Sequence, residues 1–250
     1  MVLAMHMSDG LVSPPTALLF GVVAAVGLAV AATRARRDLD DRTAPMAGLV
    51  TAFVFAVQMI NFPILPGASG HLLGGALVAI LVGPWVGSMC IAIVLVVQAV
   101  LFADGGLTAL GTNITNMALV GVFVGYGVAV ALRRFAARGR GGLVAVSFVA
   151  ALVNTVVASL AFVLQYALGG AGGASLGTVL GLMVGLHVLI GIGEGVITAA
   201  TVGAVASVRP DLVHLLRTSR PAPAVRVRSA GTRSADTRTA DTRTAEGTPS

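Results

Sequence analysis

Long apolar runs separated by short polar loops are the feature that most constrains the fold of this chain. The first run, at about residues 15–33, contains no charged residue, and as a helix rising 1.5 Å per residue it can cross a bilayer core of roughly 30 Å. Six further runs follow, at about residues 45–61, 71–82, 85–102, 113–132, 143–168 and 179–208. With 56% hydrophobic and only 10% charged residues, the sequence predicts an all-α integral membrane protein of about seven transmembrane helices.

The arginine residues predict how these helices are oriented. All sixteen basic residues are Arg, and they lie after the first run, after the fifth run and in the tail. Seven crossings place these three regions on one side, which the positive-inside rule makes cytoplasmic. We therefore expect an extracytoplasmic N-terminal loop at residues 1–14, a transmembrane domain at 15–208, and a cytoplasmic tail at 209–250. The repeated Arg, Thr, Ala and Asp residues of the tail predict disorder.

The composition also limits the chemistry. The single cysteine, Cys90, lies in an apolar run, so no disulfide framework or thiolate metal cluster is expected. Lysine is absent, which excludes a Walker A phosphate loop and Schiff-base catalysis. We therefore expect no nucleotide bound by this chain and no enzymatic activity of its own, and any energy must come from a partner or an ion gradient.

The segment from Asn61 to His71 joins two apolar runs and is a candidate ligand site. Its Pro63, Pro66, Gly67 and Gly70 cannot continue a helix. Ser69 is a plausible N-cap for a helix that begins near His71, which would hold the imidazole in the first turn. The alternative is a capping loop in which the histidine only bonds a carbonyl group.

His6 is the second candidate ligand. If the chain begins at Met5, His6 becomes its second residue and can chelate a metal ion through the terminal amine, its own backbone nitrogen and its imidazole. One further imidazole completes a square of nitrogen donors, a geometry that suits Ni(II), Cu(II) or low-spin cobalt. The nine residues from His6 to Pro15 reach at most about 30 Å, so His6 can fold back to meet His71.

Several motifs carry a family resemblance. They are Met5-His6 followed by Asp9-Gly10, Gln58-Met59-Ile60-Asn61-Phe62-Pro63, Ser69-Gly70-His71-Leu72-Leu73-Gly74-Gly75, Asp104-Gly105-Gly106-Leu107-Thr108-Ala109-Leu110-Gly111, and Asn113 with Asn116-Met117. Over about residues 5–208 the chain resembles the CbiM/NikM substrate-capture subunits of energy-coupling-factor (ECF) transporters for cobalt and nickel.

The resemblance implies a multi-pass protein of the prokaryotic plasma membrane, whose N-terminal loop plugs the metal site. It implies that His6, His71 and the terminal amine of Met5 bind the transported ion, Co²⁺ first and Ni²⁺ next. It also implies a complex with a coupling transmembrane protein, two ABC-type ATPase subunits and a small accessory membrane subunit. Membrane lipid is a further expected partner, and nucleic acid is not.

The chain departs from the family pattern at its start. Four residues precede Met5, and Ser8 stands where the family usually has proline. With those four residues present, the nitrogen of Met5 is an amide, which binds metal far less readily than an amine with a pKa of about 7.7 to 8.0. We therefore expect the functional protein to begin at Met5, which intact-mass measurement of the native protein can check.

Other polar residues of the apolar runs and loops are candidate supports of the site. Asp104 can be a plain turn residue or can orient a ligand imidazole. Amide side chains in a membrane commonly join helices, whereas ionisable ones indicate function. His187 and Glu194 can pair with each other, support the site or contact a partner. The full set of supporting residues is Asp9, Asn61, Ser69, Asp104, Asn113, Asn116, His187 and Glu194.

Two rival functions remain open at this point. Gly67-Ala68-Ser69-Gly70 is similar to the Gly-x-Ser-Gly motif of rhomboid-type intramembrane proteases, with His187 as the base for Ser69. That reading leaves the motifs around His6 and Asp104 unexplained. A secondary metal carrier driven by an ion gradient would instead work without ATPase partners.

Overall fold

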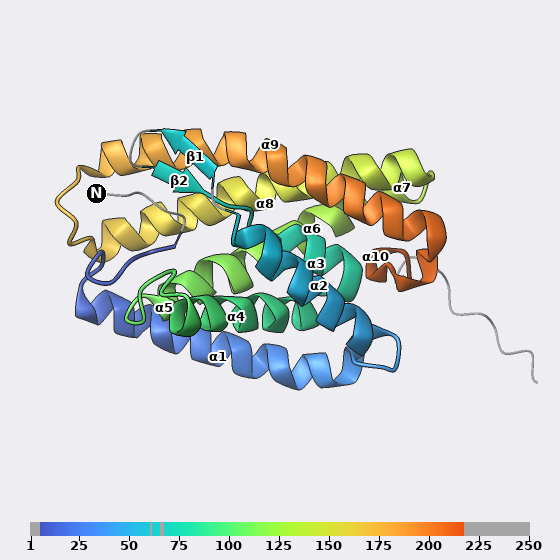
Figure 1. Cartoon of the computed structure of the whole chain (residues 1–250), viewed down its shortest axis with the longest axis horizontal. Coiled ribbons are helices and arrows are strands. Elements are labelled where there is room, and N and C mark those ends of the chain that lie inside the picture. The colour runs from blue at the N-terminus through green and yellow to red at the C-terminus, as the bar shows by residue number, and fades with distance from the viewer. Residues whose placement is uncertain (1–5, 61, 66–67, 218–250) are drawn as a thin grey trace, which may run out of the picture. The chain divides into compact units, whose positions relative to one another are not determined.

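A computed structural model describes residues 6–60, 62–65 and 68–217 of the chain. At positions 62–65 and 68–70 it describes the backbone alone. The described part is a bundle of helices with one short hairpin beside it (Figure 1). The expected all-α membrane architecture is confirmed, because five helices among the described residues are long and apolar enough to cross a membrane. They are Pro14–Asp38, Pro84–Leu101, Leu110–Ala131, Arg140–Gly169 and Leu176–Val208.

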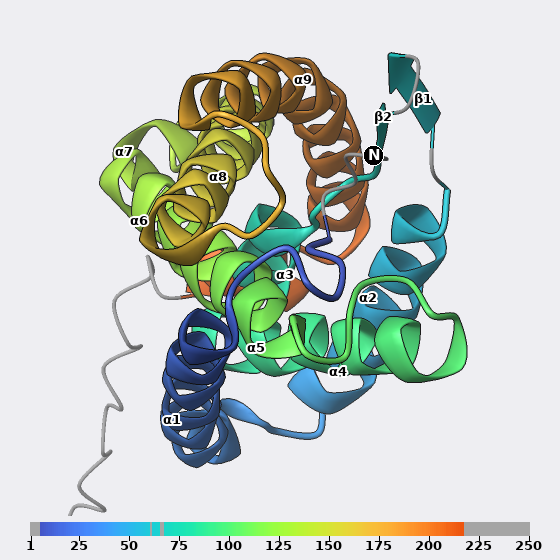
Figure 2. The ribbon, with the colours of Figure 1, turned by 90° about the vertical axis from the view of Figure 1, so that its left-hand side faces the viewer.

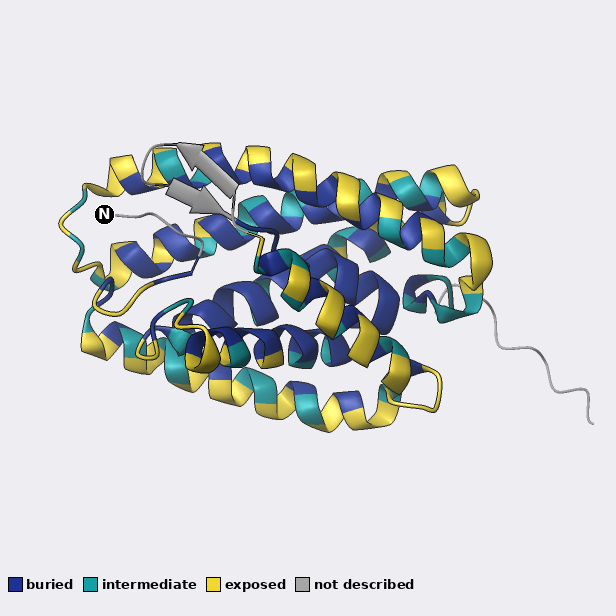
Figure 3. Cartoon of the chain, viewed as in Figure 1, coloured by how far each residue is buried: buried dark blue, intermediate teal, exposed yellow. Residues whose placement is uncertain are grey.

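Helices α1, α2 and α4 form one side of the bundle (Figure 2). Helix α1 (Pro14–Asp38) begins with two prolines after Ser13, where the missing amide hydrogens cost nothing, and ends with arginines that suit the negative end of a helix. Helix α2 (Thr43–Gln58) and helix α4 (Pro84–Leu101) pack on each other. The outward faces of these helices carry exposed apolar side chains, as a lipid-facing surface requires (Figure 3).

The opposite side is an antiparallel pair of long helices. Helix α8 (Arg140–Gly169) and helix α9 (Leu176–Val208) run alongside each other over most of their length (Figures 1 and 2). The short helix α7 (Arg133–Ala136) precedes them, and the 3₁₀ turn η2 (Pro210–Leu212) and helix α10 (His214–Arg217) follow.

One membrane segment contains an unusual stretch of backbone. Helix α5 (Leu110–Asn113) continues directly into a π-helix, η1 (Ile114–Gly121), and then into helix α6 (Val122–Ala131). A π-helix of this length is rare, and such irregularities occur frequently at functional sites. It contains Asn116, which the sequence had marked as a candidate support.

The centre of the bundle is the short helix α3 (Gly75–Val82), whose eight residues are all buried. At 1.5 Å per residue it is only about 12 Å long, so it does not span a membrane by itself. The predicted helix start near His71 is wrong, since the N-cap is Gly74. Gly74 has a φ of 77°, which turns the chain from an extended segment into the helix.

The predicted break between the second and third apolar runs is confirmed. Strands β1 (Phe62–Leu65) and β2 (Ala68–Gly70) form an antiparallel hairpin whose register is irregular between Pro63 and Leu65. The hairpin lies near one end of the bundle (Figure 1) and at the edge of the molecule in the second view (Figure 2).

The loops at that same end contact one another. Ser13 donates its backbone N–H to the carbonyl of Gly169, and Ala171 donates to Leu11. The arginine-bearing connections lie at the opposite end, where Arg217 lies 3.8 Å from Asp40. This separation fits the predicted topology, while the side of the membrane that each end faces stays a prediction.

Candidate metal centre

Two buried imidazoles lie side by side between the N-terminal loop and the centre of the bundle. The ring centroids of His6 and His71 are 4.5 Å apart, and both residues are at most 4% exposed. The Nε2 atom of each ring is buried without a hydrogen-bond partner. Burying a polar atom without a partner costs free energy. Two such nitrogen atoms in adjacent rings therefore indicate a binding site for an ion that accepts the lone pair of each.

Asp104 orients the imidazole of His6. Nδ1 of His6 lies 3.1 Å from Oδ1 of Asp104, and donation of the Nδ1 proton to the carboxylate leaves the Nε2 lone pair free. The hydrogen bond with His6 lowers the pKa of Asp104, so this carboxyl group is ionised at neutral pH. The sequence left open whether Asp104 orients a ligand or is a plain turn residue, and the geometry favours the first. The chain enters Asp104 through Ala103, whose φ of 51° is unusual for a residue with a side chain.

His71 is held by its backbone rather than by a helix. The extended segment 71–74 is fixed from two sides, because Leu73 and Gly74 donate their N–H groups to the carboxylate of Glu194 at 2.8 and 3.1 Å. Gln58 in turn donates to the carbonyl of Leu73 at 2.6 Å. Nδ1 of His71 bonds the carbonyl of Leu72 at 3.0 Å, which again leaves Nε2 as the free lone pair.

The N-terminal loop is clamped at the residue after His6. Asn113 bonds both backbone groups of Met7: its Oδ1 accepts the N–H at 2.8 Å and its Nδ2 donates to the carbonyl at 3.1 Å. Gly106 also donates to that carbonyl. A side chain at Gly106 would overlap the backbone and carboxylate of Asp9, so a glycine is required for this close approach.

Asp9 fastens the same loop further along. Its Oδ1 accepts hydrogen bonds from the backbone N–H and the hydroxyl of Thr108. The hydroxyl bond is the main reason why the pKa of Asp9 is lowered. Asp9 therefore positions the loop. Its side chain bonds Thr108 and not the imidazoles.

The expected planar chelate differs from the arrangement observed at His6. A small chelate ring through the backbone nitrogen of His6 can close only through Nδ1, and Nδ1 faces Asp104. As positioned, His6 offers Nε2. The chelate therefore requires the imidazole to turn about its Cβ–Cγ bond, so that Nδ1 faces the metal ion. Nε2 would then carry the proton.

Some of the remaining candidate residues have hydrogen-bond partners elsewhere in the bundle, and others lie outside the described region. Asn116 donates to Gln165 at 2.8 Å, and Nδ1 of His187 bonds the carbonyl of Met183. His187 and Glu194 thus have separate partners and are not hydrogen-bonded to each other. Met5 and Asn61 lie outside the described residues, and no side chain is described for Ser69.

Sequence reasoning missed the polar residues that hold Glu194. Asn154 donates to Oε1 and Thr155 to Oε2 of its carboxylate, both at 2.9 Å. The available signal was an amide within an otherwise apolar run, the same signal that had marked Asn113 and Asn116. It also missed Met7, whose fully buried side chain lies in an apolar cluster with Phe162 and Met183.

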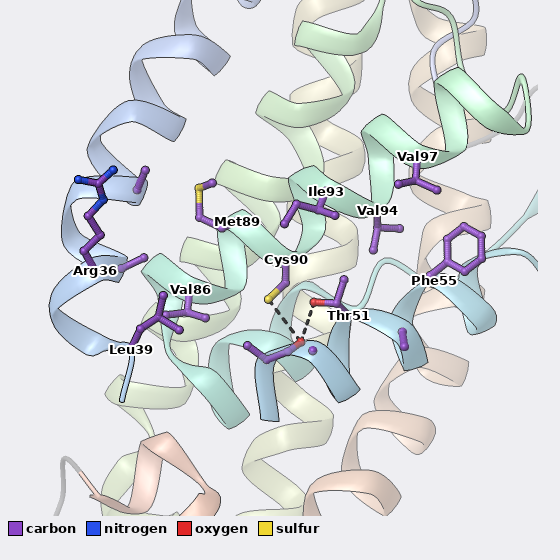
Figure 4. Close-up of a pocket in the computed structure, with 15 residues that line it drawn as sticks. Arg36, Leu39, Thr51, Phe55, Val86, Met89, Cys90, Ile93, Val94 and Val97 are labelled. Atoms are coloured by element: carbon purple, nitrogen blue, oxygen red, sulfur yellow. Dashed lines mark hydrogen bonds between the residues drawn. The ribbon is translucent and has the colours of Figure 1, made fainter. Parts of the chain in front are cut away.

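A larger cavity elsewhere in the bundle is not a metal site. It has a volume of about 610 Å³ and lies between α1, α2 and α4. Figure 4 shows its wall of apolar side chains, with Thr51 and Cys90 both donating to the carbonyl of Ala47. The lining residues include no histidine or carboxylate, and Cys90 is their only thiol, so the cavity offers no set of donors for a divalent transition metal.

We expect Asp104→Asn to weaken Co²⁺ or Ni²⁺ binding by about 10- to 100-fold, the usual cost of losing a residue that orients a ligand imidazole. The amide side chain keeps the size but not the charge of the carboxylate. Calorimetric titration of the purified variant measures the change, with Asp211→Asn at the opposite end of the molecule as the control. An unchanged affinity would contradict the role of Asp104.

The comparisons with known proteins agree with the geometry. Residues 6–212 match the CbiM family, described as the cobalt uptake substrate-specific transmembrane region. The cobalt transport protein CbiM of Sorangium cellulosum is 31% identical over 226 residues, which cover 88% of this chain and 99% of that protein. The fused nickel transport protein NikMN of Rhodobacter capsulatus is 39% identical over 120 residues, covering 48% of this chain and 35% of that protein.

A solved structure supports the same relationship. The crystal structure of a truncated transition metal transporter superposes with a TM-score of 0.74 at 30% identity, covering 81% of this chain and 98% of that one. The fold and the paired imidazoles thus define a metal transport protein of the prokaryotic plasma membrane. The chain belongs to the CbiM family of CbiM/NikM-type cobalt and nickel transporter components.

Proposed function

We propose that this chain captures Co²⁺ or Ni²⁺ from the extracytoplasmic side between His6 and His71, as the substrate-binding subunit of an ATP-driven ECF importer. The observation that carries the proposal is the pair of adjacent buried imidazoles whose Nε2 atoms have no partner. Imidazole nitrogen is a preferred ligand of these ions, and a neutral imidazole pair adds no charge that would have to be buried.

The rest of the donor set comes from the start of the chain. In a chain that begins at Met5, the terminal amine and the backbone nitrogen of His6 would add two nitrogen donors. They would complete a planar site once the His6 imidazole turns so that Nδ1, which now faces Asp104, binds the ion. Asn113, Asp9 and Asp104 hold the loop that carries these donors. Among the described residues no three His, Cys, Asp or Glu side chains are placed so that they could hold a metal ion together, so the proposal takes its further donors from the start of the chain.

Energy would be supplied by partners. The absence of lysine excludes a Walker A motif in this chain, so ATP hydrolysis is assigned to two ABC-type ATPase subunits joined through a coupling membrane protein. A small accessory membrane subunit completes the proposed complex. Cobalt is preferred over nickel in this proposal because the matched family is described by cobalt uptake.

Uptake by the assembled complex in lipid vesicles tests the proposal. We expect accumulation of radioactive Co²⁺ to require hydrolysable ATP and to persist when an ionophore removes the proton gradient. Competition with Ni²⁺ gives the preference between the two ions. Uptake by this chain alone that stops with the ionophore would instead establish a gradient-driven carrier. A fluorophosphonate probe that labels the wild-type chain but not Ser69→Ala would instead support the protease alternative.

A further inference from the structure

A small buried cavity lies beside the paired imidazoles. Its volume is about 10 Å³, close to the minimum that holds one water molecule or one ion. Every residue that lines it is buried. The walls come from η1, α8, α9 and the segment that carries His71, and include Leu73, Asn116, Met117, Ser159, Met183 and His187.

The polar groups of this cavity are prepared as ligands. Nδ1 of His187 donates its proton to the carbonyl of Met183, which leaves the lone pair on Nε2, as the same bond does in His71. Asn116 donates its amide to Gln165, while its Oδ1 atom is buried without a hydrogen-bond partner. Asn116 is only 4% exposed and lies within the π-helical stretch. Two residues that line the same small space thus carry an imidazole nitrogen with a free lone pair and an amide oxygen without a hydrogen-bond partner.

The cavity also lies directly next to the capture site. Phe162 and Met183 line the cavity and belong to the apolar cluster around Met7, the residue after His6. Leu73, two residues after His71, forms another wall. Along α9, His187 follows Met183 by one turn and precedes Glu194 by two turns, about 10 Å.

We propose that His187 and Asn116 form a second, weaker site for the transported divalent transition metal ion, which the ion occupies after it leaves His6 and His71. The imidazole Nε2 and the amide oxygen are its two protein donors, and Met117 and Met183 line the same cavity. Two strong donors bind more weakly than a full set of nitrogens, as a site of passage requires. This inference rests on the proposed function, because it concerns the same ion.

Two measurements on His187→Phe separate this role from support of the capture site. The ring of phenylalanine fills a similar volume without a donor atom. We expect Co²⁺ affinity at the capture site of the purified full chain to stay within about two-fold of wild type, while uptake by the assembled complex falls at least about 10-fold. Asn116→Leu should behave in the same way. Val188→Ala, at the neighbouring lipid-facing position, is the control and should transport normally.

Crystals of the full chain soaked at high Co²⁺ concentration locate the second ion directly. Anomalous scattering in the cavity of wild type, and its loss in His187→Phe, would support the site. A water molecule only in the cavity, together with normal uptake by His187→Phe, would overturn it. An equal fall of affinity and uptake would also overturn it, since His187 would then serve the capture site. If wild type bound no ion between His6 and His71, the proposed function itself would fail.

Discussion

Replacing His71 by alanine is expected to abolish high-affinity binding of Co²⁺ and Ni²⁺, with a loss well beyond the roughly 10- to 100-fold that a supporting residue costs. His71 contributes one of the two imidazoles that meet in the site, and its Nε2 has no other partner. Among the described residues no other group of three or more His, Cys, Asp or Glu side chains is placed to hold the ion instead. Calorimetric titration of each ion measures the effect.

Two control variants distinguish a loss of metal binding from a folding defect. His71→Gln retains a side chain of similar reach without the imidazole, and it should also lose binding. His214→Ala removes an imidazole at the opposite end of the molecule, beside Gly83, and should bind the metal normally. Thermal unfolding of the metal-free variants checks that each is folded. A folded His71→Ala variant with wild-type affinity would remove His71 from the site.

Glu194→Ala is expected to lower both stability and metal affinity. The carboxylate is 1% exposed and accepts hydrogen bonds from Leu73, Gly74, Asn154 and Thr155. Each buried donor left without an acceptor costs about 1–3 kcal/mol, so the free energy of unfolding should fall by several kcal/mol. Affinity should fall with it, because the segment that positions His71 loses its anchor.

A graded series tests that explanation. Thr155→Val keeps the volume of the side chain and removes only one donor, so it should cost about 1 kcal/mol and leave metal affinity close to wild type. Glu194→Gln keeps one acceptor oxygen but places an amide group among donors, and should lie between the two. Thermal unfolding and metal titration are measured on all three. A destabilised Glu194→Ala variant with unchanged affinity would show that segment 71–74 keeps its shape without the carboxylate.

The arrangement of helices could largely be predicted from the sequence. Apolar runs define the long helices because a bilayer offers no partner for unpaired backbone groups. Helix α1 was expected at about residues 15–33 and extends from Pro14 to Asp38, adding one turn that contains Arg36 and Arg37. The break at the two prolines before His71 was also predicted, because proline cannot donate to a helix ladder.

The start of α3 could not be predicted, because it depends on contacts far away in sequence. Ser69 is a good capping residue by type, yet the helix begins six residues later. The reason is Glu194, which takes the N–H groups of Leu73 and Gly74 and so competes with a helix for them. No local pattern reveals that a carboxylate more than a hundred residues away will do this.

For the candidate site, the sequence indicated which residues would lie together but not which of their atoms face one another, and their role as ligands stays a prediction. The pairing of His6 with His71 and the role of Asp104 agree with the geometry. The choice between Nδ1 and Nε2 of His6 does not, because it depends on where Asp104 lies relative to the ring. Likewise, the sequence showed that His187 and Glu194 share a helical face, while their separate partners depend on how α8 and the segment of His71 pack against α9.

The anchoring of the two imidazoles has a kinetic consequence. His6 is bonded to Asp104 in the loop after α4, and the next residue, Met7, is bonded to Asn113 of α5. The segment that carries His71 is instead bonded to Glu194 of α9. An ion bound to both rings would cross-link these two parts of the bundle. Any movement that separated these two parts would pull the rings apart and weaken the hold on the ion. The dwell time of the ion would then be set by the rate of that movement rather than by the strength of the bonds in the resting state.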